Sequence, residues 1–268
     1  MSSPMRIAFL GDVVGQPGKR AAVAAAKALR AAWGEAGGVI LANGENIRNG
    51  SGITPELLGQ LVQGGIDAVT LGDHALRELK IVPALERAGE PVCRPANMPF
   101  RAPGKRMVRI DRGRDRRGVT VFTVLGRTFM PTPGSDPFEC CERMLAERTH
   151  ADDIVIVEAH MEATSEKIAL ARFLDGRVAA VVGTHTHVPT ADARVLKGGT
   201  AFITDLGMCG PYDSIIGRST DAVLRHLTTG LPTQYDVAEG GTLACGAVIE
   251  ISEDTGLARS IERYELSA

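Results

Sequence analysis

Five short apolar segments of this chain each run directly into glycine or a polar residue that can bind metals. The segments are Ile7–Leu10, Val39–Ala42, Ala68–Leu71, Ile154–Val157 and Val178–Val182. Apolar runs of this length, bounded by turn-forming residues, are typical of buried strands. Open α/β sheets place their ligand sites at the carboxyl ends of strands. The pattern therefore predicts an α/β fold in which polar side chains converge at one edge of the β structure.

The segments between the strands have helical patterns. In residues 18–36, Ala22, Ala26, Leu29 and Trp33 form one apolar stripe, as expected for a helix that packs on a sheet. Thr54 followed by Pro55 is typical of a helix start. Further helices are expected at 54–64, 78–88, 137–147, 165–174 (with Ser165 as a cap) and 221–227.

The last third of the chain is expected to be rich in short strands. These lie at 191–195, 200–204, 244–251 and 260–266, and another strand is expected at 119–124. No linker and no internal repeat interrupts the chain. We therefore expect one domain over residues 1–268, with a two-layered β core and outer helices.

The composition limits the class of protein. The chain has 268 residues, 44% hydrophobic and 23% charged, with a formal net charge of −2. These values are ordinary for a globular protein and do not favour stable nucleic-acid binding. The segment 101–117 is locally basic, and we interpret it as a solvated loop in preference to a phosphate-attracting rim. The absence of a long apolar run argues against a membrane span.

The cysteines indicate a reducing compartment. The chain has five cysteines, an odd number, and no Cys-x-x-Cys pair. This usage fits free thiols and fits neither a disulfide framework nor a zinc–thiolate site. The beginning of the chain also has no signal-peptide pattern. We therefore expect a cytoplasmic protein.

A segment with two histidines follows the strand at 178–182. It reads Gly-Thr-His-Thr-His-Val-Pro at 183–189 and contains two of the six histidines of the chain, His185 and His187. On an extended backbone, residues two apart point to the same side. Both imidazoles are then directed at one point, as ligands of one metal or metal pair must be. The segment alone also permits ordinary polar loop histidines.

The ends of the five strands supply a set of metal-ligand side chains. The candidates are Asp12, Glu45, Asn46, Asp73, His160, His185 and His187. Oxygen and nitrogen ligands without thiolate suit Mn, Fe, Zn or a similar first-row metal. This set exceeds the needs of one ion but suits two ions bridged by one carboxylate. Paired metals polarise a phosphoryl oxygen and deprotonate a shared water, which then attacks phosphorus. His74 is the candidate acid for the leaving oxygen.

The motifs carry a family resemblance that extends over nearly the whole chain. The chain resembles the calcineurin-like metallophosphoesterases and, more narrowly, the bacterial YmdB-type phosphodiesterase family. The matching segments are Gly-Asp-Val-Val-Gly at 11–15, Asn-Gly-Glu-Asn at 43–46, Gly-Ile-Thr at 52–54, Arg-Pro-Ala-Asn at 94–97, His-Met-Glu-Ala-Thr-Ser-Glu-Lys at 160–167, Gly-Thr-His-Thr-His-Val-Pro-Thr-Ala-Asp at 183–192 and Thr-Asp-Leu-Gly-Met-Cys-Gly-Pro at 204–211. The last three of these are long and specific.

The resemblance implies a β-sandwich flanked by helices and a role for each candidate residue. The first metal would be held by Asp12, Glu45, Asn46 and His187. The second would be held by Glu45, Asp73, His160 and His185, with Glu45 as the bridge. His74 would act as the acid or orient the phosphate. The ions would be divalent or mixed-valence, iron or manganese in preference, with zinc also compatible.

The resemblance also implies a substrate class and an assembly. Similar proteins hydrolyse cyclic nucleotides such as 2′,3′- or 3′,5′-cyclic AMP by attack of a metal-bridging hydroxide on phosphorus. They are commonly homo-oligomers. Two alternatives remain open at this point. One is a phosphomonoesterase or nucleotidase, and the other is a regulatory nucleotide- or RNA-associated protein with weak turnover.

Two positions depart from the family pattern. Asp73 stands where the family usually has Asn. The added negative charge at the second site should bind a divalent ion more tightly and reduce its Lewis acidity, which bears on metal preference and rate. Ala75 and Leu76 follow His74 where an aromatic residue is more usual. We expect that position to line the pocket, so stacking on a base would differ.

Other polar residues near the motifs have more than one interpretation. Glu158 is interpreted as support for His160, whereas Glu162 could orient His160 or cap the following helix. Asn97 could reach a phosphate or only hold its own loop. Cys209 is interpreted as a buried structural thiol.

Overall fold

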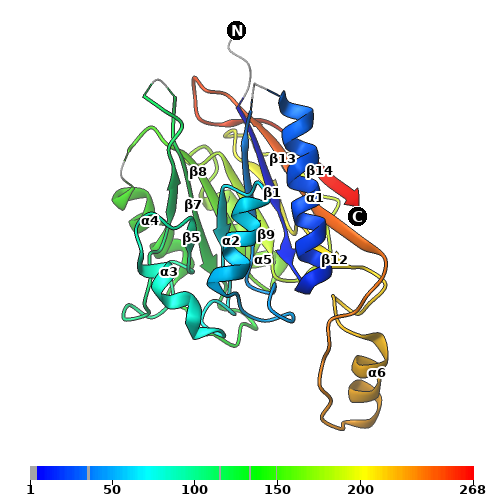
Figure 1. The fold of residues 1–268 in the computed structure, drawn as a ribbon. Coiled ribbons are helices and arrows are strands. Elements are labelled where there is room, and N and C mark those ends of the chain that lie inside the picture. The colour runs from blue at the N-terminus through cyan, green and yellow to red at the C-terminus, as the bar shows by residue number, and fades with distance from the viewer. Residues whose placement is uncertain (1–4, 35–36, 115, 133, 149) are drawn as a thin grey trace.

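Two stacked β-sheets covered by helices on both outer sides form the body of the molecule (Figure 1). This computed structural model describes residues 5–34, 37–114, 116–132, 134–148 and 150–268. The first sheet has eight strands and the second has six. Helices α1 (Gly15–Trp33) and α2 (Pro55–Gln63) pack on the first sheet, and α4 (Pro137–Glu147) and α5 (Thr164–Phe173) pack on the second.

The first sheet has the order β2-β12-β13-β1-β3-β4-β5, and β14 pairs with β13. Its strands are β1 (Met5–Leu10), β2 (Asp12–Val13), β3 (Val39–Asn43), β4 (Ala68–Thr70), β5 (Val92–Cys93), β12 (Met208–Pro211), β13 (Thr242–Ile251) and β14 (Ala258–Ser267). Strands β1, β3, β4 and β5 are parallel, whereas β13 is antiparallel to β1. The parallel strands therefore end at the same edge of this sheet.

The second sheet has the order β10-β11-β9-β8-β7-β6. Its strands are β6 (Val108–Ile110), β7 (Val119–Leu125), β8 (Ile154–His160), β9 (Ala180–Thr184), β10 (Arg194–Val195) and β11 (Ala201–Ile203). The four central strands are parallel, and β6 and β10 pair antiparallel at the two edges. As in the first sheet, the central strands deliver their carboxyl ends to one edge.

The side-chain alternation along β1 explains the layered core. Ile7 and Phe9 are buried between the two sheets, whereas Ala8 and Leu10 face the helical layer of the first sheet. Successive strand residues point to opposite faces, so a strand buried on both faces is a continuous apolar run. The predicted stripe of α1 is buried in that same outer layer. The two-layered β core with outer helices is therefore as predicted.

Several predicted elements differ from the observed ones. The predicted helix at 78–88 is a turn of 3-10 helix, η2 (Leu79–Ile81), followed by the short helix α3 (Val82–Glu86). Pro83 lacks a backbone N–H, which favours this short start over a continuous helix. Of the predicted strand at 191–195, only β10 is a strand in the structure. Residues 35–36, the end of the helix predicted at 18–36, lie outside the described residues. Ser165 is not a cap, since α5 begins one residue earlier.

A segment between β12 and β13 extends away from the sheets. It contains α6 (Thr220–Thr229), which lies apart from the other helices and strands at the lower right of Figure 1. Val223 is the buried residue of this helix, and Leu227 is 71% exposed. Within the described ranges, no helix combines the length and the apolar character that crossing a membrane requires.

Candidate metal centre

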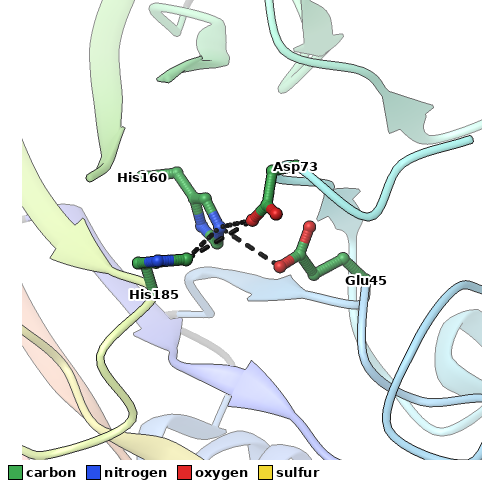
Figure 2. Close-up of side chains that lie close together, drawn as sticks. All are labelled: Glu45, Asp73, His160 and His185. Carbon is green, nitrogen blue, oxygen red and sulfur yellow. Dashed lines mark hydrogen bonds and ion pairs between the residues drawn. The ribbon is translucent and has the colours of Figure 1, made fainter. Parts of the chain in front are cut away.

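Four predicted ligands from both sheets meet at the carboxyl edge. Glu45 follows β3, Asp73 follows β4, His160 ends β8 and His185 follows β9. Figure 2 shows the four side chains pointing toward one another. Each offers one ligand atom, and these atoms all lie within 4.8 Å of one another. The stacking of the two sheets therefore joins residues that are far apart in the sequence.

The distances within this cluster are close to those of direct hydrogen bonds. The Nε2 atom of His160 lies 3.0 Å from Oδ1 of Asp73 and 3.1 Å from Oε1 of Glu45. The Nδ1 atom of His185 lies 3.1 Å from the same Nε2 atom and 3.4 Å from Oδ1 of Asp73. Glu45, Asp73 and His160 are buried, and His185 is partly exposed. Two carboxylates and two imidazoles thus surround one point.

The remaining predicted ligands lie beside this cluster. The Nδ2 atom of Asn46 is 3.3 Å from Nε2 of His187, and 3.4 Å from Oδ1 of Asp12 and from Oε1 of Glu45. The Oδ1 atom of Asn46 faces His74, so metal ligation by Asn46 requires its amide to turn over. Glu45 lies between the two groups of candidates. This is the position that a bridging carboxylate would occupy.

The backbone that carries His185 and His187 differs from the prediction. Strand β9 ends at Thr184, and the two histidines have positive φ angles of 94° and 65°. The sequence predicted that an extended backbone would direct both imidazoles to one point. The observed backbone at these two residues is not extended. The two imidazoles converge because the chain bends sharply after the strand, which turns His185 toward Asp73 and His187 toward Asn46.

His74 lies next to the cluster and partly lines the cavity. Its Nδ1 atom is 2.8 Å from Oδ1 of Asn46, and its backbone N–H donates to Oε2 of Glu45 at 2.8 Å. Its Nε2 atom lies 3.7 Å from Oδ2 of Asp73. The side chain is 28% exposed, so it reaches the solvent-accessible space.

Burial and mutual charge shift the pKa values of the cluster. Burial raises the pKa of Asp12 to about 7. Burial also opposes ionisation of Asp73, but hydrogen bonds from His160 and His185 outweigh it and hold the pKa of Asp73 below its usual range. Burial would lower the pKa of His160, yet the charge of Glu45 and bonds to Asp73 and Glu45 raise it well above the usual value. The carboxylates therefore draw positive charge to the centre of the site.

A buried network orients His160 from behind. The Nδ1 atom of His160 lies 2.9 Å from the hydroxyl of Thr184, which donates to Oε1 of Glu158 at 2.7 Å. The amide of Asn43 also donates to Oε1 of Glu158 at 2.7 Å. The predicted supporting role of Glu158 fits these bonds. Thr184 and Asn43 were not singled out from the sequence, although both lie within the quoted motifs.

Gly72 leaves the room that His160 needs. A Cβ atom at this position would overlap the imidazole ring of His160. Gly72 directly precedes Asp73 after β4, so the glycine lets the backbone of one ligand approach the side chain of another. The Gly-Asp-His sequence therefore has a steric reason as well as a chemical one.

The cluster opens into a cavity of about 290 Å³. Its lining residues are Glu45, Asn46, Gly50, His74, Glu162, His185, Thr186, His187, Ile216 and Arg218. Ile216 and Arg218 come from the segment between β12 and α6 and were missed as individual site residues, because they belong to no polar strand end. The expectation that residues 75 and 76 line the pocket is wrong. Ala75 is buried in the helical core of the first sheet, and Leu76 packs against that core.

The structure gives the contacts of Glu162, Asn97 and Cys209, whose roles the sequence alone did not decide. Oε2 of Glu162 lies 3.3 Å from Nε2 of His185, so this carboxylate faces His185 and not His160. Asn97 is buried, accepts from the N–H of Leu125 and donates to its carbonyl oxygen, and thus holds its own loop. Cys209 is buried and contacts the carbonyl oxygen of Cys245, as expected for a structural thiol.

The side chains present fit a metal. The three carboxylates of Asp12, Glu45 and Asp73 are buried, and among the described residues none of them pairs with a lysine or arginine. Buried carboxylates without such partners are stabilised by bound cations. The ligand atoms are oxygen and nitrogen, as first-row divalent metals prefer.

Comparison with known proteins agrees with the fold and the motifs. Residues 8–264 match the family described as YmdB-like protein. The 2′,3′-cyclic-nucleotide 2′-phosphodiesterase of Bacillus subtilis (strain 168) is 41% identical over 259 residues, which cover 97% of this chain and 96% of that protein.

Two solved structures are also similar. A hypothetical protein from Thermus thermophilus has a TM-score of 0.88 at 40% identity, covering 98% of this chain and 99% of that one. A novel phosphatase from Mycoplasma pneumoniae has a TM-score of 0.90 at 27% identity, covering 100% and 95%. The predicted metallophosphoesterase-like fold, with two mixed sheets flanked by helices, is confirmed. Because the family match extends over nearly all of its residues, the chain belongs to the YmdB-like protein family.

Proposed function

We propose that this protein is a metal-dependent phosphodiesterase that hydrolyses cyclic nucleotides of the 2′,3′- or 3′,5′-cyclic AMP type. The observation that carries the proposal is the cluster of Glu45, Asp73, His160 and His185 beside an open cavity. The activity named for the relative that is 41% identical supports the same class of substrate.

Seven side chains would hold two ions in this proposal. One ion would be held by Asp12, Asn46 and His187. The other ion would be held by Asp73, His160 and His185. Glu45 would contact both ions. When bound, such a pair supplies Lewis-acid polarisation of a phosphoryl oxygen and activates water as the nucleophile. Manganese or iron is proposed, and zinc is compatible with the same donors.

His74 would give a proton to the leaving oxygen. Contacts with Asn46 and Glu45 fix the ring and the backbone of this residue. If the amide of Asn46 turns so that its oxygen serves the metal, its N–H group faces Nδ1 of His74, which accepts and leaves the ring proton on Nε2 for transfer to the leaving oxygen. Since its side chain is 28% exposed, His74 can reach a substrate in the cavity.

The cavity favours a diester over a monoester. A monoester carries an additional negative charge, for which extra positive charge near the metals is needed. Arg48 is paired with Oε2 of Glu78 at 2.7 Å. Arg218 lines the cavity but donates to the carbonyl oxygens of Asn49, Gly50 and Tyr235. These cations are therefore already engaged within the protein.

The test combines metal content with turnover. Protein purified without chelator or affinity metal is analysed by mass spectrometry and assayed with bis-p-nitrophenyl phosphate and 2′,3′-cyclic AMP. We expect about two first-row metals per chain and turnover that a chelator abolishes and added Mn²⁺ or Fe²⁺ restores. Less than one metal per chain, without turnover after metal addition, would refute the proposal. Faster turnover of mono-p-nitrophenyl phosphate would favour a phosphomonoesterase instead.

The role of His74 makes a separate prediction. His74→Ala should lower kcat by roughly 10²–10⁴-fold for substrates with poor leaving groups. The loss should be much smaller with p-nitrophenolate, which needs no proton to leave, and metal content should stay unchanged. Equal losses on both substrates, or loss of metal, would assign His74 to positioning or ligation.

A further inference from the structure

Two candidate ligands lie on a backbone that needs external support. His185 and His187 both have positive φ angles, a region that non-glycine residues rarely adopt. Such conformations persist where the surrounding contacts determine them more strongly than local preference does. The two residues that flank His185, Thr184 and Thr186, are the points at which those contacts act.

A buried lysine holds the first of these residues. Lys167 lies on α5, its side chain is 0% exposed, and its Nζ atom donates to the carbonyl oxygen of Thr184 at 2.7 Å. A Cβ atom at Gly183 would overlap the carbonyl oxygen of Thr204 and would lie 2.9 Å from Cδ of Lys167. The glycine therefore lets both the neighbouring backbone and the lysine side chain approach the strand that precedes the histidine segment.

A buried aspartate holds the second residue. Oδ2 of Asp205 lies 2.8 Å from Nζ of Lys167 and accepts from both the N–H and the hydroxyl of Thr186, at 3.2 and 2.8 Å. Its Oδ1 atom accepts from the N–H of Gly207 at 2.9 Å. The side chain of Asp205 is 1% exposed. The ion pair thus contacts the chain on both sides of His185.

We infer that Lys167 and Asp205 form a positioning pair that holds His185 and His187 in the geometry needed for metal binding. The inference rests on the proposed metal centre. Neither charged group of the pair lines the cavity, so neither acts on the substrate directly. A buried ion pair contributes little net stability compared with apolar residues of similar size. Its contacts with the strained segment give it a different role, the orientation of two ligands.

The test measures metal affinity apart from activity. Three variants are compared with the unaltered protein: Lys167→Met, Asp205→Asn, and the double variant with both changes. Binding of Mn²⁺ to chelator-stripped protein is measured by calorimetry, and thermal unfolding is measured without metal. Each variant should bind Mn²⁺ roughly 10- to 100-fold more weakly, the range found when groups that orient metal ligands are removed.

The double variant separates positioning from stability. It leaves no unpaired buried charge, so it should fold even if a single variant does not. The expected result is weak Mn²⁺ binding by a folded double variant. Arg109→Met is the matched control, since it breaks a 2.9 Å ion pair with Asp153 that touches no candidate ligand, and its Mn²⁺ affinity should be unchanged.

Two outcomes would overturn the inference. Native Mn²⁺ affinity in the double variant, with only the unfolding temperature altered, would show that the pair is merely structural. This result would leave the proposed function intact. Failure of the unaltered protein to bind Mn²⁺ would remove both the proposed metal centre and the reason for positioning its ligands.

Discussion

Asp73 places a carboxylate at the position where the resemblance of the motifs leads us to expect asparagine. Its Oδ1 atom lies 3.0 Å from His160 and 3.4 Å from His185, so the extra charge is at the centre of the cluster. Hydrogen bonds from these histidines hold the pKa of Asp73 below its usual range despite burial. The residue is therefore ionised at neutral pH, and its charge adds to the attraction for a cation.

The charge of Asp73 makes a prediction about affinity and rate. Asp73→Asn should weaken Mn²⁺ binding roughly tenfold, because affinity follows the number of charged ligands. Turnover at saturating metal should rise, since a less neutralised ion is a stronger Lewis acid. Calorimetry and initial rates check the two effects. Asp111→Asn, at a side chain that is 76% exposed, is the charge-matched control and should change neither.

At the scale of elements, the site depends on how closely the strand ends approach one another. The loop after β4 passes against the end of β8 at Gly72, where a Cβ atom would overlap His160. The loop after β9 is held to the segment before β12 by Asp192, which accepts from the N–H of Thr204 at 3.0 Å and from the hydroxyl of Thr190 at 2.7 Å. Both connections bring non-adjacent loops together around the candidate ligands.

The close approach at Gly72 is tested with a matched glycine. Gly72→Ala should displace His160 and reduce metal content and turnover together. Gly59→Ala in α2 meets no atom within 4 Å and should instead stabilise the protein, by about 0.5–1 kcal/mol. Metal analysis and thermal unfolding of both variants check this contrast. Full metal content in Gly72→Ala would mean that the loop moves aside without cost.

The connection at Asp192 predicts a dependence of stability on pH. Burial opposes ionisation of Asp192, but hydrogen bonds from Thr204 and Thr190 lower its pKa below the ordinary value. A lowered pKa in the folded state stabilises the protein above the unfolded-state pKa, and this contribution is lost as the pH falls. Asp192→Asn should therefore cost about 1–2 kcal/mol at pH 7, and the difference should shrink below about pH 4. Urea unfolding at several pH values measures it, and a constant difference would contradict the assignment.

At the scale of the whole molecule, burial decides the chemistry of the cysteines. All five are free and buried. Burial raises the pKa of each thiol, and that of Cys93 reaches about 12. Cys93 lies between the sheets, Cys209 lies under the helices of the first sheet, and Cys140 and Cys141 lie on the buried face of α4, which covers the second sheet. The cysteines are therefore part of the packing and not a reactive or metal-binding set.

This burial predicts slow thiol reactivity in the folded protein. A pKa raised from 9 to about 12 lowers the thiolate fraction of Cys93 roughly a thousandfold at a given pH, and the core also excludes the reagent. Ellman's reagent should therefore react slowly with native protein and should titrate five thiols per chain in denaturant. A thiol that reacts within seconds in native protein would show that part of the core opens readily.

The exterior of the molecule includes exposed leucine side chains, and the predictions about assembly and location concern this exterior. The segment that carries α6 exposes Leu224, Leu227 and Leu231. A homo-oligomer, a cytoplasmic location and a single domain over residues 1–268 all stay predictions. Gel filtration with light scattering measures the first of these directly.

Features that depend on local pattern could be predicted from the amino-acid order. The alternation of strand faces, the apolar stripe of α1 and the polar residues at strand ends all follow from side-chain periodicity and turn chemistry. The helix start at Thr54 is another example, since its hydroxyl accepts from the N–H of Leu57. Short strands such as β2 and β5 were missed, because two residues are too few to show a period.

The contacts between strand ends that are far apart in the sequence are decided only by the tertiary structure. The bond between Asn43 and Glu158 joins residues 115 positions apart, and it depends on how the two sheets stack. The positive φ angles of His185 and His187 likewise depend on contacts made by the chain around them, including those of Lys167 and Asp205. Residue type and spacing specify which groups are available for chemistry. Packing between distant segments specifies their directions, because long-range contacts leave no periodic signal in the sequence.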